Sequence, residues 1–236
     1  MVDWKPSSPL QNLQQRARTL ASIRRFFAER DVLEVETPIL ASTTVPDVYI
    51  ESISAELKDG NNSEAYFLQT SPEFFMKRLL ASGSGSIYQL TKAFRQEEKG
   101  RIHNTEFTLL EWYRVSYSLE ELMTELECLV QEILGCDPIP RFSYREIFQK
   151  HLHIDPHQIP LAELEQLARE RIDLAGSDLS KTDYLQLLLA NAIEPELPAF
   201  CFIYDYPQEQ AALSTLAEDD FSVVVAKRFE LFGHGM

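Results

Sequence analysis

Residues 94–113 read FRQEEKGRIHNTEFTLLEWY, and this stretch decides the fold. Its two ends are rich in aromatic and branched apolar residues, whereas its middle is polar and charged. This pattern is typical of two strands joined by a polar loop. Near the end of the first strand, Arg95 and Glu97 alternate and would share one face. Taken alone, they could form a surface ion pair, and Phe107 could be ordinary sheet core.

The segment before this stretch predicts a hairpin and a helix. Residues 59–64 have the composition of a turn, and residues 66–70 are typical of a strand. Ser71, Pro72 and Glu73 then supply a capping serine, a proline suited to the first helical position and an early acidic residue. We therefore expect a helix that begins at Ser71 and is broken by the Gly/Ser run at 82–86.

The remaining chain predicts an α+β protein. Apolar residues at helical spacing over 13–27 indicate an amphipathic helix, and the alternation at 32–37 indicates a strand that Pro38 ends. Residues 119–198 are mainly helical and are interpreted as an accessory region, with strands expected at 200–204, 221–225 and 229–232. The predicted architecture is an antiparallel sheet flanked by helices, with residues 1–236 as a single domain.

Composition limits the classes of partner and compartment. The 37 acidic residues outnumber the 22 basic ones, and the net charge of −15 disfavours a phosphate backbone as partner, although a local basic cleft stays compatible with it. Three cysteines without a CxxC pair favour a reducing cytoplasm over a disulfide framework. No leader and no apolar run of about 20 residues is present, so neither secretion nor membrane insertion is expected.

Together, the residues at 94–97, 103–104 and 106–113 resemble motif 2 of class II aminoacyl-tRNA synthetases. Within that class they resemble the lysyl branch, and especially the elongation factor P-lysine ligases. The helix, strand and Pro38 resemble motif 1, which forms the dimer interface in the family, so the resemblance implies a homodimer. The segment Ser71-Pro72-Glu73 resembles the part that contacts the amino-acid substrate.

The resemblance assigns roles that the chemistry explains. Arg95 would be the catalytic residue, because its guanidinium can bridge a carboxylate and the α-phosphate of ATP, which repel each other. The carboxylates and the phenol of the amino-acid site would suit the ammonium groups of a lysine-like substrate. The ATP-binding set is Arg95, Gln96, Glu97, His103, Asn104 and Phe107. The amino-acid-binding set is Ser71, Pro72, Glu73, Glu111 and Tyr113.

The family continues with an acidic strand that binds Mg²⁺ and ATP and with a motif 3 arginine that covers the adenine. Both would lie beyond Met236, so the C-terminal part of the fold is expected to be missing, and no residue of this chain is assigned as a metal ligand. We accordingly expect weak or absent catalysis by this chain alone. The cofactors implied by the family are nevertheless ATP and Mg²⁺.

Three functions follow as hypotheses. The first is an ATP-dependent ligase that activates lysine or β-lysine as an aminoacyl-adenylate and transfers it to a lysine of elongation factor P. The second is a lysyl-tRNA synthetase catalytic domain that charges tRNA, which the acidic composition disfavours. The third is a non-catalytic paralogue that only binds a ligand or partner.

Two weaker signals have structural explanations. His151, His153, Asp155 and His157 are close in sequence, but alternate histidines in a proline-bounded polar stretch are usually solvated, so a metal site is not expected there. Cys128 lies on an apolar helical face and is predicted to be a core residue.

Overall fold

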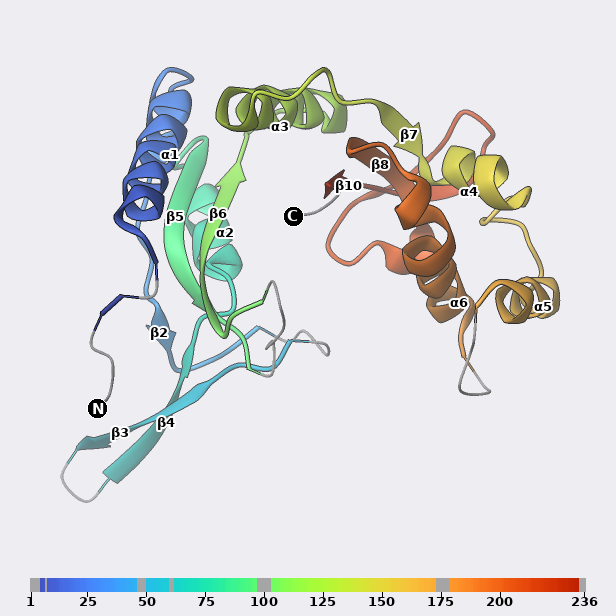
Figure 1. The fold of residues 1–236 in the computed structure, drawn as a ribbon. Coiled ribbons are helices and arrows are strands. Elements are labelled where there is room, and N and C mark those ends of the chain that lie inside the picture. The colour runs from blue at the N-terminus through green and yellow to red at the C-terminus, as the bar shows by residue number, and fades with distance from the viewer. Residues whose placement is uncertain are drawn as a thin grey trace. The chain divides into compact units, whose positions relative to one another are not determined.

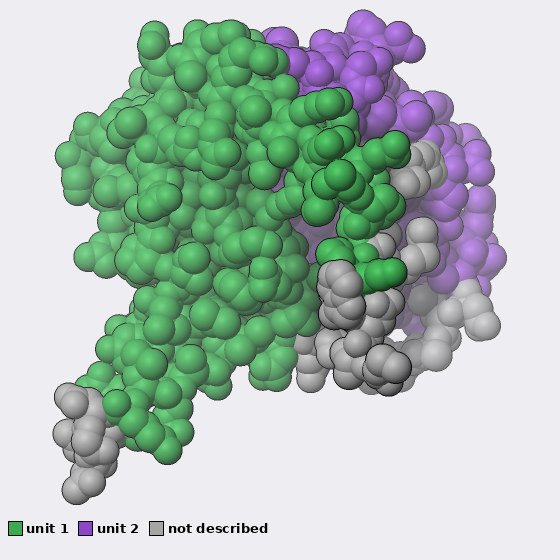
Figure 2. Space-filling model, turned by 60° about the vertical axis from the view of Figure 1, so that its left-hand side comes forward, with its two compact units in different colours: residues 1–117 green, residues 118–236 purple. Residues whose placement is uncertain are grey.

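A computed structural model describes residues 5–6, 8–45, 50–59, 62–96, 103–172 and 179–233. The chain divides into two compact units, Met1–Tyr117 and Ser118–Met236 (Figure 2). Each unit is described by itself below. That residues 1–236 form a single catalytic domain stays a prediction.

Unit 1 contains the strand pair that the sequence predicts. Strand β5 (Ile87–Phe94) pairs antiparallel with β6 (Glu106–Tyr113), and β1 (Leu33–Glu34) pairs parallel with β5, in the order β1-β5-β6 (Figure 1). The strand predicted at 32–37 is shorter than expected, although the Val35 N–H still donates to the Tyr88 carbonyl at 2.9 Å. The ladder therefore continues for one more hydrogen bond past β1.

Helix α1 (Leu10–Ala28) covers one face of this sheet. The Phe27 ring of α1 stacks on the Tyr88 ring, with the two ring centroids 4.4 Å apart. The centroids of the Phe27 and Trp112 rings are 5.7 Å apart. Tyr88 and Trp112 are cross-strand partners, so both point to the same face. Because side chains alternate along a strand, the odd-numbered residues of β5 and β6 point to the opposite face. That face carries Phe107, Glu111 and Tyr113, the predicted site residues of β6.

A second sheet in unit 1 has the order β2-β4-β3, with β2 at Leu40–Ala41, β3 at Ser54–Asp59 and β4 at Asn62–Leu68. Strands β3 and β4 pair antiparallel from Ser54↔Phe67 to Asp59↔Asn62, which confirms the predicted hairpin. In Figure 1 this hairpin extends away from the rest of unit 1.

Helix α2 (Glu73–Ala81) follows the hairpin, and its start differs from the prediction. The helix begins at Glu73, Pro72 occupies the N-cap position, and no side chain caps the first turn, so the assignment of Ser71 as the N-cap was wrong. The physical reason is that a residue before proline disfavours helical backbone angles, which leaves Ser71 outside the helix.

Unit 2 combines helices with a four-stranded sheet of order β7-β8-β10-β9. Its elements are α3 (Leu119–Leu134), β7 (Arg141–Ser143), α4 (Tyr144–Leu152), α5 (Leu161–Arg171), α6 (Lys181–Leu188), the π-helical η1 (Leu189–Ile193), η2 (Glu194–Glu196), β8 (Phe200–Pro207), η3 (Gln208–Gln210), β9 (Leu216–Glu218) and β10 (Val224–Gly233). Buried residues of α4, α5, α6 and β8 form one core, which includes Tyr144, Phe148, Leu164, Leu185 and Ile203. The helices and the mainly antiparallel sheets, in which only β1–β5 and β7–β8 pair parallel among the described strands, confirm the predicted α+β class.

Two details of unit 2 correct the sequence analysis. The strand expected at 221–225 begins only at Val224, because the Asp219 carboxylate accepts the N–H groups of Phe221 and Val223 and holds a turn there. Cys128 is exposed, so its assignment to the core was wrong; α3 buries Met123 and Leu129 instead. Among the described residues, no helix is both long and apolar enough to cross a membrane.

Candidate active site

Arg95 lies directly after β5, on the sheet face opposite α1. Its N–H donates to the Thr105 carbonyl at 3.0 Å, which extends the β5–β6 pairing past the last strand residue. Its guanidinium carbon lies 5.1 Å from the centroid of the Phe107 ring, and its Nε donates a long 3.5 Å hydrogen bond to the Thr70 carbonyl. The aromatic ring and the carbonyl orient the guanidinium.

An acidic group lies on the same face, further along β6. The Tyr113 hydroxyl donates to Oε1 of Glu111 at 2.6 Å, and Lys77 Nζ lies 2.6 Å from Oε1 of Glu73. The pKa of Glu111 is raised, chiefly by burial and also by the nearby Glu73 charge. The Tyr113 hydrogen bond and the Lys77 charge act in the opposite direction and lower it. Burial and the Glu111 carboxylate also raise the pKa of Tyr113 above its usual value. Two elements, α2 and β6, thus bring their carboxylates together.

The segment before α2 links these two parts of the face. Gln69 is buried, and its Nε2 donates to Thr91 Oγ1 at 3.0 Å and to the Lys92 carbonyl at 2.8 Å. The Phe94 N–H donates to the Gln69 carbonyl at 2.9 Å. These hydrogen bonds hold the segment before Glu73 against β5. Arg95 follows directly after the same strand.

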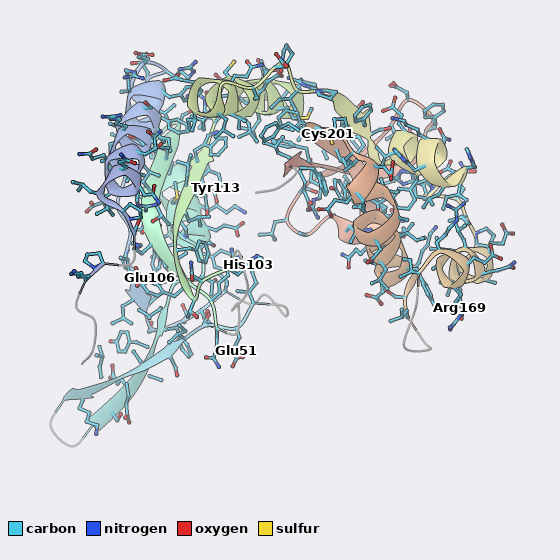
Figure 3. The ribbon with its side chains drawn as sticks, in the orientation of Figure 1. Glu51, His103, Glu106, Tyr113, Arg169 and Cys201 are labelled. Carbon is cyan, nitrogen blue, oxygen red and sulfur yellow. The ribbon has the colours of Figure 1, made fainter. Side chains whose placement is uncertain are left out.

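The other predicted residues lie as follows. Ser71 is half-buried and Pro72 is buried at the start of α2. Gln96 is exposed, and its N–H donates to the Glu51 carbonyl at 2.9 Å. His103 and Asn104 are exposed just before β6, and Figure 3 shows His103 and Tyr113 toward opposite ends of that strand. Glu97 lies outside the described residues.

Sequence reasoning missed several polar residues of this face. Gln69 and Gln89 are buried, Thr37 Oγ1 donates to Gln89 Oε1 at 3.0 Å, and Gln89 is the cross-strand partner of Glu111. Lys77 was also missed. A glutamine within an otherwise apolar strand is the signal that could have identified the first two, because such a residue is buried only with hydrogen-bond partners.

The face has a cationic part around Arg95 and an acidic part around Glu73 and Glu111. A guanidinium beside an aromatic ring suits phosphate oxygens and a flat base, and two carboxylates with a phenol suit an ammonium group. These groups fit a nucleotide and an amine-bearing amino acid. Among the described residues, no group of three His, Cys, Asp or Glu side chains is arranged to hold a metal ion, so no described residue is assigned to Mg²⁺.

The histidine-rich segment of unit 2 has a different environment. The Asp155 carboxylate accepts hydrogen bonds from the Arg145 guanidinium and from the backbone N–H of His157. Burial and the Arg145 charge lower the pKa of His157. His153 is exposed at the C-cap of α4.

The α+β fold fits a class II synthetase, and the chain belongs to this family, because the family model for tRNA synthetases class II (D, K and N) matches residues 1–236. It is 44% identical over 244 residues to the elongation factor P–(R)-β-lysine ligase of Yersinia enterocolitica, covering 100% of this chain and 74% of that protein. It is also 44% identical over 243 residues to the ligase of the same name from Erwinia tasmaniensis, with the same coverage of 100% and 74%. The Mannheimia succiniciproducens ligase is 42% identical over 239 residues, covering 99% of this chain and 73% of that protein. The resemblance inferred from motif 2 is confirmed.

Proposed function

We propose that this protein is an ATP-dependent ligase that activates lysine or β-lysine and transfers it to a lysine side chain of elongation factor P. The relatives that carry this name cover the whole chain at 42–44% identity. The single observation that carries the proposal is that Arg95 and the acidic group of Glu73 and Glu111 share one face of the β5–β6 sheet.

In the first step, a carboxylate oxygen of the amino acid attacks the α-phosphorus of ATP, and pyrophosphate leaves. Arg95 binds both anions and stabilises the charge that develops on the phosphorus oxygens. Phe107 stacks on the adenine, and Gln96, Glu97, His103 and Asn104 contribute to ATP binding. Mg²⁺ accompanies ATP and supplies further charge neutralisation.

The amino acid is held by its ammonium groups. Glu73 and Glu111 bind an ammonium, Tyr113 orients the Glu111 carboxylate, and Ser71 and Pro72 shape the entry to α2. In the second step, the ε-amine of the acceptor lysine attacks the carbonyl carbon of the adenylate, and AMP leaves with the bonding electron pair. The amine loses its proton to solvent, which completes an amide bond.

Further features belong to the same proposal. The protein acts as a homodimer through the helix and strand before Pro38, in the cytoplasm, where its three cysteines stay reduced. tRNA is not its acceptor, in keeping with the net charge of −15, which opposes a broad electrostatic grip on nucleic acid.

The test offers each acceptor separately. The full-length protein is incubated with ATP, Mg²⁺ and labelled lysine or β-lysine, together with either elongation factor P or tRNA. Label in elongation factor P supports the proposal, whereas label in tRNA alone supports the tRNA-charging alternative. Pyrophosphate exchange without an acceptor isolates the first step, and its absence together with intact ligand binding would favour a non-catalytic binding protein.

A further inference from the structure

Helix α2 brings a cation to the acidic group of the site. Lys77 lies one turn after Glu73, with its Nζ 2.6 Å from Glu73 Oε1, and the two side chains are 41% and 30% exposed. Partly exposed pairs at this spacing contribute little to stability. The Glu165–Arg169 pair of α5 has the same spacing. Lys77 acts on a second carboxylate besides Glu73, because its charge lowers the pKa of Glu111.

The two carboxylates of the site have different surroundings. Glu73 is the first residue of α2, and its carboxylate pairs with the Lys77 ammonium. Opposing effects act on the pKa of Glu111: burial and the Glu73 charge raise it, whereas the Tyr113 hydrogen bond and the Lys77 charge lower it. Opposite Glu111 on β5 lies Gln89, which is neutral.

We propose that Lys77 is a positioning residue of the amino-acid site, which fixes the Glu73 carboxylate and offsets its repulsion of Glu111. Both carboxylates are then placed to receive a ligand ammonium. With two carboxylates and one ammonium, the group keeps one net negative charge, which a single ligand ammonium neutralises. The nature of that ligand rests on the proposed function, whereas the effect on Glu111 does not.

The first experiment uses the ligand-free protein. Glutamate labelled with ¹³C at the side-chain carboxyl reports the pKa of Glu111 by NMR, assigned with Glu111→Gln. Lys77→Met should raise this pKa, and Lys77→Arg should restore it. The matched control is Arg78→Met, which removes the neighbouring cation of the same helix, located over the Phe75 ring. An unchanged Glu111 pKa in Lys77→Met, or an equal rise in Arg78→Met, would overturn the inference.

The second experiment measures lysine and β-lysine binding by calorimetry. Lys77→Met should lose about threefold to tenfold more affinity near pH 6 than near pH 8, because loss of the Lys77 charge raises the pKa of Glu111 and favours its protonated form at the lower pH. An equal loss at both pH values would mean a merely structural role and would contradict the inference. If Lys77→Met folds poorly, Lys77→Gln replaces it. A wild-type protein that binds neither amino acid contradicts the proposed function, while the NMR titration still decides the role of Lys77.

Discussion

The Tyr113 hydroxyl donates a 2.6 Å hydrogen bond to Glu111, two residues earlier on the same strand and on the same face. This hydrogen bond stabilises the ionised form of a carboxyl whose pKa burial raises. Tyr113→Phe should therefore raise the pKa of Glu111 and weaken lysine binding by about tenfold, the usual worth of a hydrogen bond to a charged group. Calorimetry at neutral pH measures the loss.

The hairpin offers a matched control for this substitution. Tyr66 donates to Glu64, also two residues earlier on its strand, at 3.3 Å and on an exposed surface. Tyr66→Phe should leave lysine affinity unchanged. A similar loss in both variants would show that the effect does not arise from the Tyr113–Glu111 pair.

Glu111→Gln separates stability from binding. Burial raises the folded-state pKa of Glu111 above its usual value, so the folded protein holds this proton more tightly than the unfolded chain. The free energy of unfolding therefore falls as the pH rises from the unfolded pKa through the folded one. Glu111→Gln should remove this part of the fall and lose lysine binding. Urea unfolding over the acidic to neutral range tests the first effect; a variant less stable than wild type at neutral pH would contradict it.

Arg95→Lys should fail to replace arginine. A lysine keeps the positive charge but cannot contact the carboxylate and the phosphate with a planar fork, so pyrophosphate exchange by the full-length protein should fall by about 10²–10³-fold. The unfolding midpoint should stay close to that of wild type, because Arg95 is only half-buried. Arg78→Lys serves as the control, and near-normal exchange by Arg95→Lys would refute the bridging role of the guanidinium.

Asp219→Asn should destabilise unit 2. The Asp219 side chain is 11% exposed and accepts from Arg145, which is 7% exposed, at 3.0 Å. Burial alone would raise the pKa of Asp219, but the N–H groups of Val223 and Phe221 and the Arg145 guanidinium together lower it. Because Arg145 keeps Asp155 as a second partner, the loss should be about 2 kcal/mol, the worth of a hydrogen bond to a charged group.

The pH dependence gives this prediction a second check. Because the folded pKa of Asp219 is lowered, its stabilisation is present above the unfolded pKa and is lost as the pH falls through the folded value. The difference between wild type and Asp219→Asn should thus shrink in acid. Glu165→Gln, which breaks the exposed pair with Arg169, should cost much less stability than Asp219→Asn. An equal loss in the free energy of unfolding for the two variants would contradict the claim that burial makes the Asp219–Arg145 pair more stabilising than the exposed pair.

Much of the site could be predicted from short-range patterns. The strands on either side of the polar loop followed from their apolar ends, and the period of two along a strand places Phe107, Glu111 and Tyr113 on one face. Predictions that depended on one local rule were less secure. Ser71 had the composition of a cap, but the backbone restriction before Pro72 prevails, and the helix begins two residues later.

Other features had no local signal. Cys128 shares a helix with buried Met123 and Leu129, and only the packing of α3 determines that the thiol stays exposed. The burial of Gln69 likewise depends on hydrogen-bond partners on β5, more than twenty residues later in the chain.

By itself, the sequence determined the β5–β6 pair, the location of Arg95 at its end and the membership in the class II synthetase family. Only the tertiary structure decided that α2 places Glu73 and Lys77 beside Glu111, and that Thr70 contacts Arg95. The physical reason is that strand period and turn composition act over a few residues and are written in the local sequence. A charge that acts across two elements depends on how those elements pack, and no local pattern encodes it.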